Sequence, residues 1–299
     1  MLPSAIIAGS SKCGSTSLFH WLGAHPDVCA SHVKEVRFFM DDGYPLPRPR
    51  EADLGLPGYE TFFAHCPAGG CRVVLEATPD YLYQQSALAE LPKLPSRPRL
   101  IFLLRKPSER IYSLYRFAMH NVSSVDQGTT FRQFLADIAN PQHRIYRDII
   151  LRDALVQSEY FRWLEAWAAW FEPERIYIGL FEQMRADARG FTRGVCQFLD
   201  LDPTFYDTYE FPVLNESFVV RNQRLHRLRH RLVAAVPGLP QLTLAKKLYR
   251  MVNVSSGKQA NGTTRGDEDV AELRRLDEHF APWNARLAEK FNLDLSCWA

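Results

Sequence analysis

The sequence has no long apolar run, and we expect no amino-terminal leader. None of its 299 residues lies in a stretch that approaches the roughly 18 consecutive apolar residues of a membrane span. The first strand candidate begins soon after Met1, and no basic segment precedes it. These absences predict a cytoplasmic protein without a transmembrane segment.

An excess of charge of one sign is also absent. The chain has 36 lysines and arginines against 34 acidic residues, a formal net charge of +2. A protein that binds nucleic acid through a broad basic surface carries a larger excess, so we expect no nucleic-acid partner. A local basic pocket for a small anion remains compatible with this balance.

The cysteines are few and lack the spacing of metal ligands, so no metal site is predicted. Cys66 and Cys71 are close enough in sequence to close a small loop. In a cytoplasmic protein reduced thiols are favoured instead. The six cysteines are Cys13, Cys29, Cys66, Cys71, Cys196 and Cys297.

Short apolar runs alternate with segments of helical periodicity along the chain. This alternation predicts an α/β fold, a parallel sheet with helices on both faces and a helical C-terminal region, in one domain over residues 1–299. Ligands in such folds bind outside the carboxyl ends of the strands. The strand candidates are residues 5–9, 28–30, 72–77, 100–104 and 176–180. The helix candidates are residues 14–25, 59–64, 86–94, 108–121, 130–139, 153–171, 187–199 and 268–290, with a helical pattern from 216 onward.

The first strand candidate leads into a polar loop bounded by Gly9 and Gly14. In a strand–loop–helix arrangement, the loop N–H groups and the positive end of the helix dipole point at one place and bind phosphate. Lys12 adds a positive charge, and the hydroxyls of residues 15–17 add donors. An ordinary βα turn needs neither, so the composition favours phosphate binding.

This loop departs from the nucleotide-triphosphate pattern G-x-x-x-x-G-K-(S/T). Ser15 stands where that pattern has its lysine, and Lys12 lies inside the loop. The most apolar strand candidate ends in Arg105 rather than in an acid that could hold magnesium. Because Glu76 does end another strand candidate, an ATP-dependent P-loop kinase remains an alternative, as does a non-catalytic nucleotide-binding module.

A second cluster follows the strand candidate at 100–104. Pro107 favours a helix start, Arg105 leaves the strand end, and Ser113 lies two turns into the helix. Both side chains could reach one anionic group. A capped helix with exposed charges explains the same residues.

Taken in order, these segments resemble the sulfotransferases that use 3′-phosphoadenylyl sulfate (PAPS). Residues 9–18 resemble the 5′-phosphosulfate loop, and residues 105–115 resemble the 3′-phosphate motif R-x-P-x-x-R-x-x-S-x-Y. Between them, KEVRFF at 34–39 and LEATPDY at 75–81 resemble the heparan sulfate sulfotransferase branch. The resemblance implies a P-loop-like fold and PAPS as co-substrate, with no metal.

The resemblance also implies residue roles. Glu76 would be the general base, Lys12 would stabilise the leaving group and Lys34 would assist. A carbohydrate or glycolipid hydroxyl, or an amine, would be the acceptor, with a small molecule as the alternative. Ala77, where the family often has lysine, and Glu159, where N-sulfating members have histidine, leave the acceptor open. The implied cofactor-binding residues are Lys12, Cys13, Gly14, Ser15, Thr16, Ser17, Arg105, Ser113 and Lys258.

Overall fold

The computed structural model describes most of the chain, in two compact units that are treated separately below. Lys258 lies outside the described residues. The described residues are 1–67, 69–212, 219–220, 254–255 and 265–299. The first unit comprises Met1–Arg110, Leu155–Leu214 and Phe280–Ala299, and the second comprises Ile111–Ala154 and Asn215–His279.

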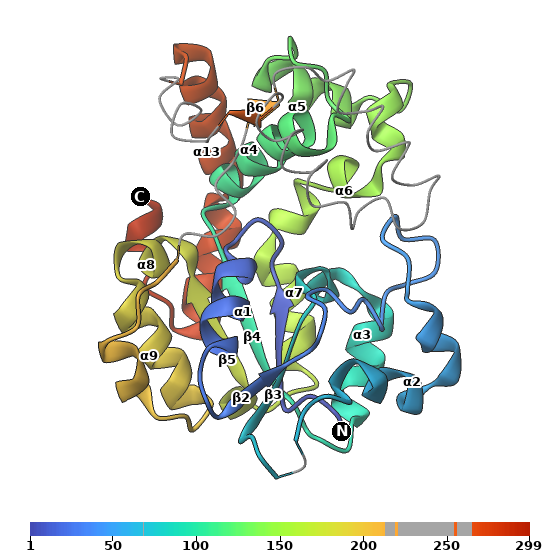
Figure 1. Ribbon diagram of the computed structural model, residues 1–299. Coiled ribbons are helices and arrows are strands. Elements are labelled where there is room, and N and C mark those ends of the chain that lie inside the picture. Colours follow the sequence, from blue (N-terminus) through green and yellow to red (C-terminus); the bar gives the residue numbers. More distant parts are fainter. Residues whose placement is uncertain (68, 213–218, 221–253, 256–264) are drawn as a thin grey trace. The chain divides into compact units, whose positions relative to one another are not determined.

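The first unit is built on a five-stranded sheet in the order β2-β3-β1-β4-β5, with all neighbours parallel (Figure 1). In the register, Ile6 of the central strand lies opposite Glu76 on one side and Leu100 on the other. The predicted parallel sheet is therefore confirmed. The strands are β1 Ala5–Gly9, β2 Val28–Ala30, β3 Val73–Ala77, β4 Arg99–Leu104 and β5 Ile176–Leu180.

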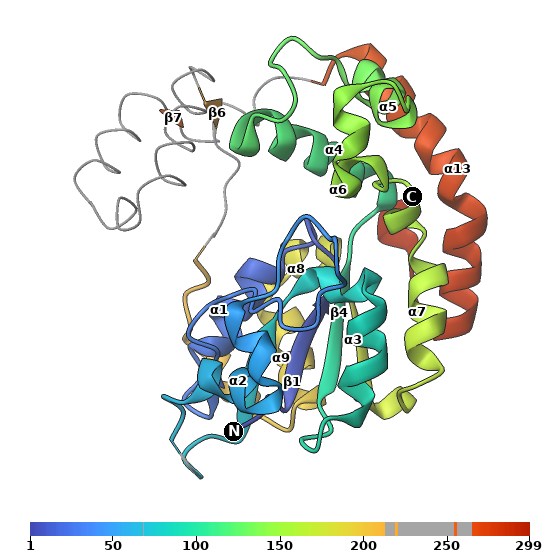
Figure 2. The same cartoon turned by 90° about the vertical axis from the view of Figure 1, so that its right-hand side faces the viewer.

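Helices cover both faces of this sheet, as predicted (Figure 2). Side chains alternate across a strand, so Ala5 and Ile7 enter the core beneath α1 and α9, while Ile6 and Ala8 enter the core beneath α7. Among the described residues, no helix is both long and apolar enough to cross a membrane. The helices of this unit are α1 Ser15–Gly23, α2 Leu56–Glu60, α3 Gln85–Glu90, α7 Tyr160–Ala168, α8 Phe181–Ala186 and α9 Ala188–Phe198.

The second unit contains α5 (Phe131–Ala139), α6 (Ile149–Arg152) and a short antiparallel pair of strands, β6 (Val219–Val220) and β7 (Val254–Ser255). The two strands correct the prediction of a helical pattern from 216 onward. Arg132 of α5 pairs with Glu272 at 2.8 Å. Glu272 belongs to one of two helices that run from one unit into the other. These helices are α4 Pro107–Phe117 and α13 Asp267–Phe291.

The prediction of one long helix over 153–171 is wrong. A 3-10 turn at Val156–Ser158 precedes α7, and Glu159 between them has ψ of 64°, outside the helical range. Two side chains of this turn bind a buried guanidinium, described below. That tertiary contact overrides the helical periodicity of the sequence.

The cysteine prediction also needs correction. Cys29 forms a disulfide with Cys66, and Cys71 is a free thiol. Chain folding brings the Cα atoms of the bonded pair to 5.8 Å across a sequence separation of 37 residues. Nothing in the local cysteine spacing indicated this pairing.

The core beneath α7 makes the first testable prediction. Phe102 of β4 is fully buried and packs against Trp167 with ring centroids 5.6 Å apart. Phe102→Ala removes this packing and leaves a cavity, so we expect a loss of about 3–5 kcal/mol in the free energy of unfolding, measured with urea. Trp170→Ala is the matched control, since Trp170 is 63% exposed. An equal loss in both variants would contradict the assignment of the core.

Candidate active site

The loop between β1 and α1 has the backbone expected for an anion-binding turn. Lys12 has φ of 70° and Gly14 has φ of 89°, both in the left-handed region. This φ at Gly14 strains residues with a side chain, and a Cβ there would also lie 2.2 Å from the methyl group of Met184 and 3.0 Å from the Phe181 ring, so the position favours glycine. The predicted residues Cys13 to Ser17 thus lie at the start of α1, where helix N–H groups favour an anion.

The buried guanidinium of Arg110 holds this loop in place through hydrogen bonds. Arg110 is fully buried, and its Nε donates to Ser10 Oγ at 3.1 Å and to the Ser11 carbonyl at 3.2 Å. Its Nη1 donates to Ser158 Oγ at 2.9 Å and its Nη2 donates to Gln157 Oε1 at 3.0 Å. Sequence reasoning gave Arg110 no role, although it is the second arginine of the RKPSER segment. The loop geometry therefore depends on residues that lie far away in sequence.

Two further cations belong to this region: Lys12, within the loop, and Arg105, directly after β4. Burial and the positive charge of Arg105 lower the pKa of Lys12 to about 8. The Arg105 guanidinium lies 4.8 Å from the Phe181 ring centre and donates to Glu109 at 3.2 Å. Its Nε is buried and has no hydrogen-bond partner among the described residues. Lys12 and Arg105 repel each other, and a bound anion would relieve this repulsion.

The structure does not place Ser113 and Lys258, the remaining predicted cofactor ligands, relative to Arg105. Ser113 lies in the part of α4 that belongs to the second unit, whereas Arg105 belongs to the first. Lys258 is outside the described residues. Their joint binding of a 3′-phosphate stays a prediction.

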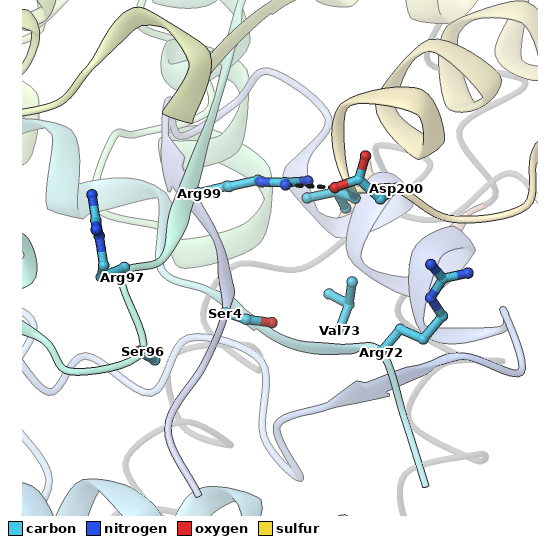
Figure 3. Close-up of a pocket in the computed structure, with 8 residues that line it drawn as sticks. Ser4, Arg72, Val73, Ser96, Arg97, Arg99 and Asp200 are labelled. Atoms are coloured by element: carbon cyan, nitrogen blue, oxygen red, sulfur yellow. Dashed lines mark hydrogen bonds and ion pairs between the residues drawn. The ribbon is translucent and has the colours of Figure 1, made fainter. Parts of the chain in front are cut away.

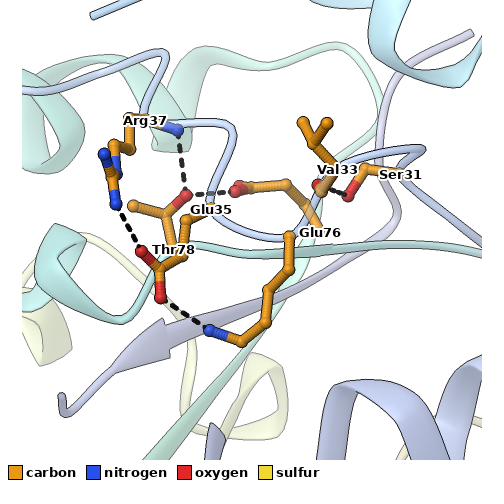
Figure 4. Close-up of polar contacts among 7 residues, drawn as sticks. Ser31, Val33, Glu35, Arg37, Glu76 and Thr78 are labelled. Carbon is orange, nitrogen blue, oxygen red and sulfur yellow. Dashed lines mark hydrogen bonds and ion pairs between the residues drawn. The ribbon is translucent and has the colours of Figure 1, made fainter. Parts of the chain in front are cut away.

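A buried carboxyl lies at the end of β3. Glu76 is fully buried and accepts from the Tyr59 hydroxyl at 3.1 Å. It also accepts from the Thr78 hydroxyl at 2.5 Å (Figure 4). Burial raises the pKa of Glu76 to about 7, although both hydrogen bonds and the charge of Lys34 oppose the rise. A carboxyl that titrates near neutral pH can accept a proton from a bound hydroxyl. Tyr59 was not singled out in the sequence, because its hydrogen bond exists only in the folded chain.

Lys34, the other predicted catalytic residue, lies in the same cluster. Its Nζ pairs with Glu35 at 2.8 Å, and Arg37 pairs with the second oxygen of Glu35 at 2.7 Å. The charge of Lys34 acts on Glu76, but its ion pair is with Glu35. The structure thus brings the KEVRFF and LEATPDY segments together, as their order in sequence suggested.

A cavity of about 370 Å³ lies at the opposite, amino-terminal end of the strands (Figure 3). Arg99 lines it, forms an ion pair with Asp200 at 2.5 Å and donates to the Phe198 carbonyl at 2.6 Å. Ligands of parallel sheets bind at the carboxyl ends of strands, so this cavity is separate from the candidate active site.

The parallel sheet, the glycine-bounded loop and the cations beside it define a phosphate-binding α/β protein of the P-loop-like class. Comparison with known families makes the assignment specific. The family profile of the sulfotransferase domain matches residues 2–218. The chain belongs to the sulfotransferase family and carries the enzymatic domain of that family.

Individual relatives are distant. The bifunctional heparan sulfate N-deacetylase/N-sulfotransferase 4 of Mus musculus is 25% identical over 211 residues, which cover 68% of this chain and 23% of the relative. The heparan sulfate glucosamine 3-O-sulfotransferase 3B1 of Homo sapiens is 24% identical over 287 residues, which cover 95% of this chain and 62% of the relative. The chain therefore spans less than two thirds of the length of either relative. A sulfotransferase structure from Alicyclobacillus acidocaldarius shares the fold, with a TM-score of 0.67, 20% identity and coverage of 100% of this chain and 99% of that one.

Burial of Glu76 predicts a stability that depends on pH. The pKa of this carboxyl rises from 4.5 to about 7 on folding. Between these values the unfolded chain releases the proton while the folded chain keeps it, so stability falls as pH rises through this window. Glu76→Gln removes the buried charge, and we expect a gain of up to about 3 kcal/mol near pH 9 but little change near pH 4. Thermal unfolding of wild type and Glu76→Gln at both pH values measures this gain, and Glu51→Gln, at an exposed position, is the control. An equal change in the stability of Glu76→Gln at pH 4 and pH 9 would refute the burial argument.

The hydrogen bonds of Arg110 predict a loss of stability when its guanidinium is removed. Arg110→Met keeps the side-chain length but removes the hydrogen bonds that the guanidinium donates to the buried hydroxyls of Ser10 and Ser158. We expect the free energy of unfolding to fall by at least about 2 kcal/mol, measured with urea. Arg48→Met, at an exposed ion pair, is the matched control and should leave stability unchanged. Similar stability of the two variants would show that the loop needs no brace.

Proposed function

We propose that this protein transfers a sulfuryl group from PAPS to a hydroxyl or amine of a carbohydrate or glycolipid. Membership of the sulfotransferase family supports the reaction class. The observation that carries the mechanism is Glu76, a buried carboxyl with a pKa of about 7 at the carboxyl edge of the sheet that also carries the anion-binding loop. A group with this pKa is half ionised at neutral pH, which suits a general base.

Each cation has a place in the proposed reaction. The loop N–H groups of Cys13 and Gly14, with the hydroxyls of residues 15–17, hold the 5′-phosphosulfate. Lys12 stabilises the negative charge that develops on the bridging oxygen as the nucleotide leaves. Arg105, with Ser113 and Lys258, binds the 3′-phosphate. The unpartnered Nε of Arg105 supports this role, because it leaves a buried donor for a ligand oxygen.

Glu76 takes the proton of the acceptor while the acceptor oxygen or nitrogen forms its bond to sulfur. Most of the rate enhancement in such transfers comes from alignment and charge stabilisation. Lys34 assists on the sulfuryl or acceptor side. Its ion pair with Glu35 keeps it close to Glu76.

The acceptor is proposed from the relatives, whose names identify them as heparan sulfate enzymes. Ala77 provides no charge for an anionic sugar. Glu159 is buried and pairs with Arg162 at 2.7 Å. The saccharide acceptor is therefore proposed from the relatives alone, and its position of sulfation is left to experiment.

Two variants test the reaction. Glu76→Gln should lower kcat for transfer of radiolabelled sulfuryl groups from PAPS to a de-O-sulfated heparan sulfate acceptor by about 10²–10⁴-fold, with the Kd for adenosine 3′,5′-bisphosphate unchanged, because only the proton acceptor is lost. Arg105→Ala should weaken binding of the bisphosphate but leave that of adenosine 5′-monophosphate almost unchanged. Full activity of Glu76→Gln would contradict the proposal, as would magnesium-dependent phosphoryl transfer from ATP in place of sulfuryl transfer from PAPS.

A further inference from the structure

Cys29, His65 and Cys66 form a cluster that the proposed reaction does not use. Cys29 belongs to β2, the strand at one edge of the sheet, and the other two residues follow the 3-10 turn Thr61–Phe63. The two Sγ atoms and Nε2 of His65 all lie within 4.8 Å of one another. The cysteine spacing gave no sign of this cluster, because 37 residues separate Cys29 from Cys66. Thiolate and imidazole are typical zinc ligands, so the cluster has the chemistry of a zinc site.

The imidazole of His65 faces both sulfur atoms. Its Nε2 lies 3.6 Å from Cys29 Sγ and 4.0 Å from Cys66 Sγ. The Ala30 carbonyl oxygen, 3.1 Å from the same nitrogen, and the ring of His32, packed edge-on with centroids 6.3 Å apart, orient the imidazole. In a tetrahedral site with Zn–S of about 2.3 Å and Zn–N of about 2.0 Å, sulfur and nitrogen ligands lie about 3.6 Å apart. The observed distances are close to that geometry.

The surroundings suit an ion that enters from solvent. His65 is exposed and Cys29 is half-buried, whereas Cys66 is buried. Three protein ligands leave the fourth position of a tetrahedral zinc ion to water, which the exposed side of the cluster supplies. Two thiolates also neutralise the charge of a divalent ion, so the bound ion adds no net charge to a partly buried place.

We propose that Cys29, His65 and Cys66 bind Zn²⁺ when the disulfide is reduced. A dithiol reductant delivers two electrons and two protons, so the S–S bond breaks, both cysteines become thiols and the reductant becomes a cyclic disulfide. Zn²⁺ then displaces both thiol protons to the solvent and forms two Zn–S bonds. The proton on Nε2 of the neutral imidazole moves to Nδ1, and Nε2 forms the Zn–N bond.

The bound ion takes over the link that the disulfide makes in the oxidised chain. Two thiolates on one tetrahedral zinc ion have their sulfur atoms about 3.8 Å apart. The Cα atoms of Cys29 and Cys66 are 5.8 Å apart, so rotation of the side chains provides this separation. Zinc therefore joins β2 to the segment after α2 in the reduced protein. This site is independent of the proposed reaction, and its test needs no PAPS.

A zinc titration of the full chain tests the proposal. The protein is reduced with a dithiol, desalted under nitrogen and titrated with Zn²⁺ in competition with a chromogenic chelator. We expect Cys29→Ser, Cys66→Ser and His65→Ala each to weaken zinc binding by at least about tenfold, because each removes a ligand. Cys71→Ser, at a free thiol, and His20→Ala, at an exposed histidine, are the matched controls and should bind zinc as tightly as the wild type.

The outcomes separate a zinc site from a disulfide that merely has a histidine beside it. Oxidised wild type should bind zinc at least about tenfold more weakly than the reduced protein, because its thiolates are absent. Equal zinc affinity of reduced wild type and His65→Ala overturns the proposal, as does equal affinity of the oxidised and reduced wild type. His65 is exposed, so His65→Ala keeps the test decisive even if a cysteine variant does not fold.

Cobalt in place of zinc identifies the ligands. Co²⁺ bound to reduced wild type should show a thiolate-to-cobalt charge-transfer band, since cysteine thiolates are among its ligands. The band should lose about half its intensity in Cys29→Ser, which removes one thiolate of the pair, and keep its intensity in Cys71→Ser. An unchanged band in Cys29→Ser would show that other cysteines bind the ion and would overturn the assignment.

Discussion

The candidate active site depends on one buried interaction, the guanidinium of Arg110 between the anion-binding loop and the turn before α7. Arg110 donates hydrogen bonds to Ser10, Ser11, Ser158 and Gln157. A buried charge is costly unless it is fully hydrogen-bonded, and here the loop itself supplies part of the bonding. The loop is therefore preorganised by the fold, and its N–H groups need little rearrangement to meet an anion.

The second constraint is the environment of Glu76. Burial raises the pKa of its carboxyl to about 7, and that value is limited by the hydrogen bonds of Tyr59 and Thr78 and by the charge of Lys34. The same burial that makes this carboxyl basic also costs stability once it ionises. The chain belongs to the sulfotransferase family, and we propose that this carboxyl serves sulfuryl transfer.

Much of this architecture could be predicted from local sequence. The apolar runs that lead to Gly9, Glu76 and Arg105 predicted three strands of the sheet, because a buried parallel strand needs a short continuous apolar run. The hydrogen bonds of Arg110 and the raised pKa of Glu76 could not be predicted in this way. Gln157 and Tyr59 acquire their roles only through contacts between distant segments, and helical periodicity at 153–171 gave no sign of the turn that presents Gln157. The Cys29–Cys66 disulfide was missed for the same reason.

The central claim of our proposal is that the loop holding Lys12 and the neighbouring Arg105 together bind a nucleotide with a 3′-phosphate, and a comparison of nucleotide affinities tests it most directly. Calorimetry in the presence of a chelator would compare adenosine 3′,5′-bisphosphate with ATP, and a second titration would supply ATP with magnesium. The account predicts that the bisphosphate binds at least about tenfold tighter than either form of ATP, a difference of about 1.4 kcal/mol. Tighter binding of ATP with magnesium would contradict it.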